Sequence, residues 1–144
     1  HLGLLYEEQG KLAEAQQAYE KEMEYYPNHF RARFNLGKIL LARGDFDGYM
    51  KQMEKVIEFA PEEAEGYLFY ARGKLLRQDN PEDILKLINT GLSRAKTPEL
   101  KALGYYLLAD VYSRLGQTIG VQEALARANQ YKNQAENKKN EKTD

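Results

Sequence analysis

The sequence predicts an all-α solenoid made of stacked, antiparallel helix pairs. Apolar residues recur at intervals of three or four along most of the chain, which is the spacing of one helix face. Turn residues recur as well, and three pairs are each 34 positions apart: Gly3 and Gly37, Gly10 and Gly44, and Pro27 and Pro61. A period of 34 residues is typical of a repeat unit that consists of a helix, a turn and a second helix.

The composition limits the kinds of function. The chain has 144 residues, which suggests one domain, and its formal net charge is only −1 although 30% of the residues are charged. A balanced surface argues against a general affinity for nucleic acid or for anionic lipid. The absence of cysteine excludes disulfides, thiolate catalysis and cysteine-based zinc sites.

No stretch of the sequence is long and apolar enough to cross a bilayer, so we expect no direct membrane insertion. The sequence does not indicate a cellular compartment. Because it begins inside a repeat and without methionine, we expect a fragment of a longer protein or a mature product.

Turn residues divide the chain into four units. The units are expected at about residues 1–27, 28–61, 62–97 and 98–131, followed by a polar tail at 132–144 that we expect to be disordered. Helices are expected at about residues 1–9, 11–26, 32–42, 46–59 and 64–77. Pro61 is expected in the first turn of the helix that follows it, and Asn80 is expected to cap a helix that begins at Pro81.

These units resemble the tetratricopeptide repeat, in which small and aromatic residues recur at fixed positions and a proline closes each unit. The residues that carry the resemblance are Gly3, Tyr6, Gly10, Ala15, Tyr19 and Pro27 in the first unit, Leu36, Gly37, Gly44, Phe46 and Pro61 in the second, Tyr67, Ala71 and Gly91 in the third, and Tyr105, Ala109, Tyr112, Gly116 and Ala128 in the fourth. The resemblance extends to about Tyr131 and implies a right-handed α-α superhelix.

The resemblance also implies where a partner binds, because the first helices of successive units in this family line a concave groove. The corresponding positions are Arg31, Phe34, Asn35, Lys38, Leu68, Phe69, Arg72, Leu103, Tyr106, Leu107 and Asp110. Large apolar groups are prominent in this set, and contiguous exposed apolar surface usually marks an interaction site. We therefore predict a scaffold or adaptor that binds a peptide or a helix of a protein partner.

One subclass of the family is disfavoured. Members that grip a peptide carboxylate use lysine, arginine and asparagine at set groove positions, and only Asn35 fits that pattern. Glu65 and Phe69 stand at the matching places of the third unit. An apolar helix or an extended segment is therefore the expected ligand.

The sequence offers no cluster of catalytic groups. Its two histidines are His1, at the terminus, and His29, in the turn after Pro27, where a surface role is the more common one. The glutamate runs are typical of solvated helix faces. The eleven tyrosines fall mostly on the packing stripe, so base stacking is disfavoured. We expect no enzyme activity, no metal site and no cofactor in this segment, and no nucleic-acid partner.

Two alternatives stay open. The chain could be a docking or regulatory region of a larger enzyme, such as a transferase or a sulfatase-like hydrolase, whose catalytic domain lies elsewhere. It could also form a homo-oligomer through the groove or through the exposed end of the fourth unit.

Overall fold

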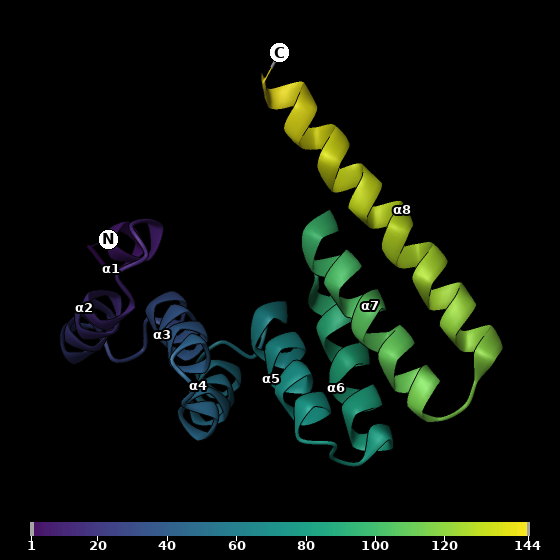
Figure 1. The fold of residues 1–144 in the computed structure, drawn as a ribbon, viewed down its shortest axis with the longest axis horizontal. Coiled ribbons are helices and arrows are strands. Elements are labelled where there is room, and N and C mark those ends of the chain that lie inside the picture. The colour runs from purple at the N-terminus through teal and green to yellow at the C-terminus, as the bar shows by residue number, and fades with distance from the viewer. Residues whose placement is uncertain (1, 144) are drawn as a thin grey trace. The chain divides into compact units, whose positions relative to one another are not determined.

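A computed structural model describes residues 2–143, and all the regular structure in that range is helical (Figure 1). The helices are α1 (Leu2–Glu8), α2 (Leu12–Tyr25), α3 (Phe30–Ala42), α4 (Phe46–Phe59), α5 (Ala64–Leu76), α6 (Pro81–Arg94), α7 (Pro98–Arg114) and α8 (Thr118–Thr143). The structure confirms the predicted all-α solenoid of helix pairs.

The chain divides into two compact units, of which the first ends at Pro61 and the second begins at Glu62. In the first unit α1 packs against α2, α2 against α3, and α3 against α4. The first unit contains a core cluster of buried residues: Ala15, Tyr19, Ala32, Leu36, Ile39 and Leu40. The cluster joins α2 to α3, so these consecutive helix pairs share one core.

Small residues let the helices of a pair approach closely in the first unit. A Cβ atom at Gly3 would lie 2.7 Å from the ring of Tyr19, and one at Gly37 would lie 2.5 Å from Cε of Met53. Such separations are shorter than van der Waals contact, so the neighbouring side chain would have to move. The two glycines therefore serve the close packing that the repeat pattern implied.

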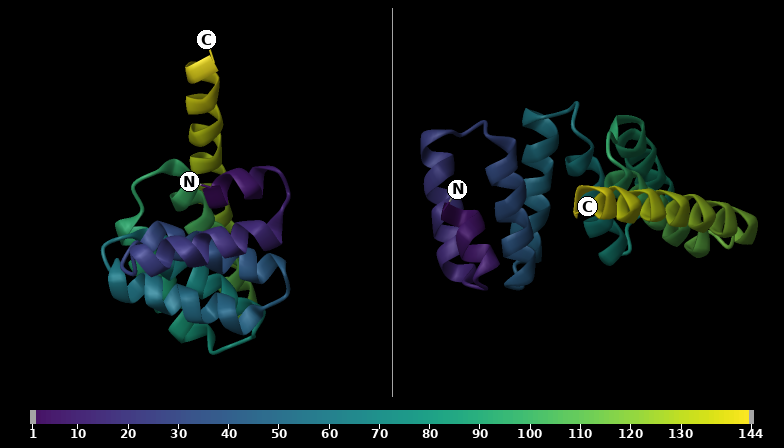
Figure 2. Two further views of the ribbon diagram at one scale, coloured as in Figure 1. Left: turned by 90° about the vertical axis from the view of Figure 1, so that its left-hand side faces the viewer. Right: turned by 90° about the horizontal axis from the view of Figure 1, so that it is seen from above.

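In the second unit α5 packs against α6 and α7, α6 also packs against α7, and α7 packs against α8. Leu68, Ile84, Ile88, Leu107 and Val111 are among the buried residues of its core. The C-terminal turns of α8 project beyond α7 (Figure 2). The core therefore lies at the junction of α5, α6 and α7 and extends to the first half of α8.

The turns between paired helices differ in how they reach the left-handed backbone conformation. Gly10, Gly44 and Gly116 do so with φ between 71° and 87°, as expected for residues that lack a Cβ atom. The third turn has no glycine, and Gln78 adopts φ 63° there. The side chain of Arg77 donates to Asp79 at 2.6 Å in the same turn, which holds the loop around Gln78.

Two details differ from the sequence predictions. Pro61 lies in the turn before α5, three residues ahead of its first residue, Ala64, and Glu63 takes the N-cap position in extended conformation. Residues 132–143, expected in a disordered tail, continue α8 as a helix. Ala135 is buried there, beside Ala102 and Leu103 of α7, so this part of α8 packs on α7 through a small side chain. The N-cap at Asn80 was expected, and its side chain accepts a hydrogen bond from the backbone of Glu82 at 2.9 Å.

Candidate functional site

The groove residues predicted on α3 have different environments. Arg31 and Lys38 are exposed, whereas Phe34 is only 4% exposed. The two basic side chains cover its ring, with Cζ of Arg31 5.7 Å and Nζ of Lys38 5.1 Å from the ring centroid. Asn35 is half-buried and hydrogen-bonds to Tyr19. On this helix the exposed groups are therefore basic and the apolar one is covered.

The predicted residues on α5 and α7 belong to the second unit. Leu68 is fully buried and Leu107 nearly so, and both belong to the core of that unit. A Cβ atom at Gly91 of α6 would lie 2.6 Å from Leu68, which shows how tightly this side chain is enclosed. Phe69 is half-buried and Arg72 is exposed. Leu68 and Leu107 therefore stabilise the fold and present no open surface.

Leu103 and Tyr106 lie together in an open hollow of about 350 Å³ between α7 and α8, which we call the α7–α8 hollow. Its other lining residues are Glu99, Ala102, Lys132, Ala135, Glu136 and Lys139. The apolar part of the lining comes from both helices, and charged residues of both signs accompany it. The hollow thus joins two predicted site residues to several that the sequence did not single out.

Hydrogen bonds fix the polar end of this region. The Tyr106 hydroxyl donates to Oδ1 of Asn129 on α8 at 2.9 Å, which links α7 to α8. Asp110 is exposed and pairs with Arg114 at 3.5 Å, and Arg114 also donates to the carbonyl of Leu75 at 2.8 Å. Arg114 consequently ties α7 to the C-terminal end of α5.

The α8 contribution was missed because residues 132–144 contain no large apolar side chain. A signal was nevertheless present in the sequence. Ala124, Ala128, Tyr131 and Ala135 follow one another at intervals of three and four, which is the spacing of one helix face. The three alanines are buried, so the stripe extends one turn beyond the predicted end of the domain.

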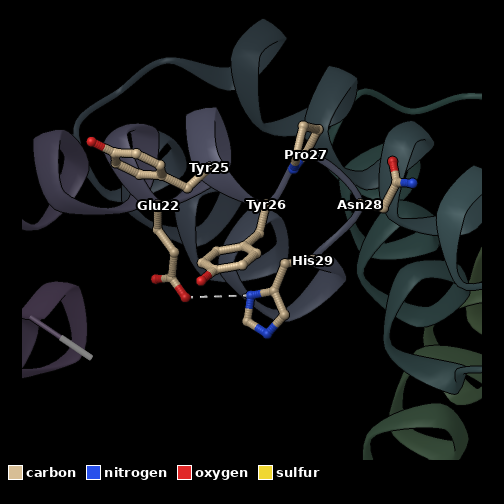
Figure 3. Close-up of a pocket in the computed structure, with 6 residues that line it drawn as sticks. All are labelled: Glu22, Tyr25, Tyr26, Pro27, Asn28 and His29. Atoms are coloured by element: carbon tan, nitrogen blue, oxygen red, sulfur yellow. Dashed lines mark ion pairs between the residues drawn. The ribbon is translucent and has the colours of Figure 1, made fainter.

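A second hollow, of about 570 Å³, lies at the turn between α2 and α3 (Figure 3). We call it the α2–α3 hollow, and its lining residues are Glu22, Tyr25, Tyr26, Pro27, Asn28 and His29. Nδ1 of His29 lies 3.4 Å from Oε1 of Glu22. In Figure 3 the rings of Tyr26 and His29 lie next to the Glu22 carboxylate. The sequence analysis assigned His29 only a surface role.

Other kinds of site find little support in the part of the chain that the structure describes. Within residues 2–143 there is no group of three or more histidine, cysteine, aspartate or glutamate side chains placed to hold a metal ion. None of the helices in this range has the length and apolar character needed to cross a membrane.

Stacked helix pairs with open surface hollows define a helical repeat protein of the protein-interaction class. A tetratricopeptide repeat model matches residues 6–73. This match supports a tetratricopeptide repeat protein, and the same helix-pair architecture continues beyond the matched residues to Thr143. A comparison with curated proteins finds no match to this sequence.

Solved structures with the same fold include MamA, with a TM-score of 0.75, 20% identity, and coverage of 92% of this chain and 75% of that one. MamA of Desulfovibrio magneticus aligns with a TM-score of 0.72, 18% identity, and coverage of 92% and 72%. A thermophilic tetratricopeptide repeat protein of Thermus thermophilus aligns with a TM-score of 0.71, 19% identity, and coverage of 88% and 69%. At these identities the similarity concerns the fold.

Proposed function

We propose that the chain is a non-catalytic scaffold that binds an apolar peptide segment of a protein partner in the α7–α8 hollow. The observation that carries the proposal is the meeting of Leu103 and Tyr106, two residues selected for their groove positions, in one open hollow. Repeat proteins of this class use preformed helical surfaces in this way, which limits the entropy lost on binding.

The floor of the hollow favours an apolar ligand. Leu103 and Tyr106 are half-buried, and Ala102 and Ala135 are small enough to leave space beside them. A leucine or phenylalanine side chain of a partner helix fits that space, and its burial would contribute about 1.5–3 kcal/mol to the binding free energy. Tyrosine is common among residues that dominate binding energies, because its ring supplies area and its hydroxyl remains hydrogen-bonded.

The charged residues of the lining favour one orientation of the bound partner segment. Glu99 comes from α7 and Glu136 from α8, whereas the two lysines, Lys132 and Lys139, both come from α8. A segment with charges of both signs beside its apolar face therefore matches the hollow better than a uniformly acidic one. This agrees with the near-neutral charge of the whole chain.

The experiment is a selection of displayed peptides against the intact chain, followed by affinity measurement on the variants Tyr106→Ala and Leu103→Ala. We expect enriched peptides to carry large apolar residues at helical spacing, and each variant to weaken binding at least about tenfold. Leu125→Ala is the matched control, since Leu125 on α8 is exposed and does not line the hollow.

Circular dichroism of each variant separates loss of binding from loss of structure. Undiminished binding by both folded variants, or an equal loss in the Leu125 control, would contradict the assignment of the site.

A further inference from the structure

We propose that the α2–α3 hollow binds a basic side chain, a lysine ammonium or an arginine guanidinium, of a peptide. This goes beyond the function proposed above, because the hollow lies in the other unit and recognises charge in place of apolar surface. The argument rests on a comparison with the equivalent positions one repeat later, on the exposed aromatic rings, and on the local charge.

Two residues of the hollow depart from what the repeat requires for packing. Glu22 and Tyr26 occupy the positions that Val56 and Ala60 occupy 34 residues later, and both of those residues are buried, at 0% and 2% exposure. A carboxylate is costly in a sealed apolar position, and a tyrosine does not fit where alanine is enclosed. Glu22 and Tyr26 are therefore better accommodated at an open surface site than in a sealed core.

The aromatic rings of the hollow are available to a cation. Tyr25 and Tyr26 are 72% and 67% exposed. Among the described residues, no basic side chain lies over either ring. By contrast Phe59, the equivalent of Tyr25, has Cζ of Arg33 5.2 Å and Nζ of Lys55 6.0 Å from its ring centroid. The same position thus already stacks with cations in the second repeat, and such contacts contribute about 0.5–2 kcal/mol.

The charge around the hollow favours a cation over an anion. Glu22 is the acidic residue of the lining, and none of the lining residues is a lysine or an arginine. The Glu22 carboxylate lies in the hollow itself, and its side chain is 24% exposed. The neighbour paired with it is His29, which leaves a second carboxylate oxygen for an incoming ammonium or guanidinium group.

The loop that carries these side chains is held in place. The backbone of His29 donates to the carbonyl of Tyr26 at 3.1 Å, and the backbone of Tyr26 donates to that of Glu22 at 2.9 Å. The guanidinium of Arg33 donates to the carbonyl of Pro27 at 2.9 Å. A preorganised loop loses little freedom when a ligand binds, so a single side chain can be recognised.

The test is a titration of the intact chain with capped pentapeptides in which arginine or lysine is flanked by glycines, followed by NMR of the tyrosine rings. We expect saturable shifts of the Tyr25 and Tyr26 ring signals with both peptides. Peptides with citrulline or acetyl-lysine, which keep the shape and lose the charge, should bind at least about tenfold more weakly.

Glu22→Gln should weaken binding of the arginine peptide at least about fivefold, since it removes the charge and keeps the volume. Glu24→Gln is the matched control, because Glu24 is exposed on the same helix and does not line the hollow, so its affinity should stay within twofold. Circular dichroism confirms that both variants are folded. The proposal would be overturned if the Glu22 and Glu24 variants bound the arginine peptide equally well. It would also be overturned if the acetyl-lysine peptide bound as tightly as the lysine peptide.

Arg33 stacks on Phe59 in the second repeat, and the position 34 residues before Arg33 precedes His1. In a longer form of the protein, residues before His1 are therefore an alternative occupant of the α2–α3 hollow, and the test must include that form. A longer form of the chain should still bind the arginine peptide. If it does not, while the chain of 144 residues does, the hollow belongs to the protein's own preceding segment and peptide recognition is refuted. Neither result affects the α7–α8 hollow, which is assayed separately.

Discussion

The turn after α2 and the turn after α4 occupy equivalent places in successive repeats, yet their chemistry differs. Val56 in the last turns of α4 and Ala60 at its C-cap are buried, whereas the equivalent positions of α2 hold Glu22 and Tyr26 beside an open hollow. Both turns carry a proline at the equivalent position of the repeat, Pro27 in the first and Pro61 in the second. The two turns therefore share a backbone plan, and the side chains at the equivalent positions differ in polarity and size.

The comparison shows how a repeat fold separates stability from recognition. Burial of apolar side chains at one copy stabilises the unit, by about 25 cal/mol for each Å² removed from water. The other copy can then carry polar and aromatic groups without unfolding the chain, because each repeat is stabilised by its neighbours. The same division appears on α2, where Tyr19 is buried and Tyr25 is exposed.

The largest expected effect comes from exchanging the residues between the two copies. Val56→Glu places a carboxylate where the side chain is fully buried, and it should lower the free energy of unfolding by about 3 kcal/mol or more. Glu22→Val, at the open copy, should change the free energy of unfolding by less than about 1 kcal/mol. Urea unfolding followed by circular dichroism measures both, and comparable losses would show that the two places are equivalent after all.

The helix-pair turns give a second, smaller contrast. Gly44 has φ 87°, so Gly44→Ala forces a Cβ atom into the left-handed conformation and should cost about 1–2 kcal/mol. Gln78 already bears that strain at φ 63°, so Gln78→Gly should stabilise the chain by up to about 1 kcal/mol. Thermal unfolding of the two variants tests whether the first is destabilised and the second stabilised. Destabilisation by Gln78→Gly would mean that the Gln78 side chain contributes more than its backbone strain costs.

The smallest expected effect is on the alkaline stability of the first unit. Burial, and then the hydrogen bond to the Glu7 carboxylate and its charge, raise the pKa of Tyr19, while Asn35 opposes this. The neutral phenol is therefore favoured in the folded state, and its contribution is fully present below the unfolded pKa of about 10 and declines as the pH rises further.

Tyr19→Phe should consequently make the loss of stability above about pH 10 shallower than in the unmodified chain. Urea unfolding at a series of pH values gives the slopes. An unchanged slope in the Tyr19 variant would contradict the structural role of this tyrosine.

Much of the fold could be predicted because the residues that recur at fixed positions of the repeat have strong backbone preferences. Gly10, Gly44 and Pro27 mark turns, and Asn80 marks a helix start, from local chemistry alone. The burial of Leu68 and Leu107 could not be predicted in the same way. A large apolar residue at a groove position has the same sequence signature whether a partner or the core covers it.

The α7–α8 hollow was predicted only in part for a related reason. Leu103 and Tyr106 stand at recognisable positions, whereas Ala135 and Lys132 depend on how far α8 continues along α7. That length is set by contacts of small side chains, which leave a weak signal in the sequence. The α2–α3 hollow needed the comparison between copies, since Glu22 by itself resembles any surface glutamate.

The most direct test of the proposed function is to locate a selected peptide on the chain by intermolecular nuclear Overhauser effects. The account predicts contacts from an apolar peptide side chain to the ring of Tyr106, the methyl groups of Leu103 and the methyl group of Ala135. Contacts confined to Ile119 and Leu125, which are exposed elsewhere on α8, would contradict it.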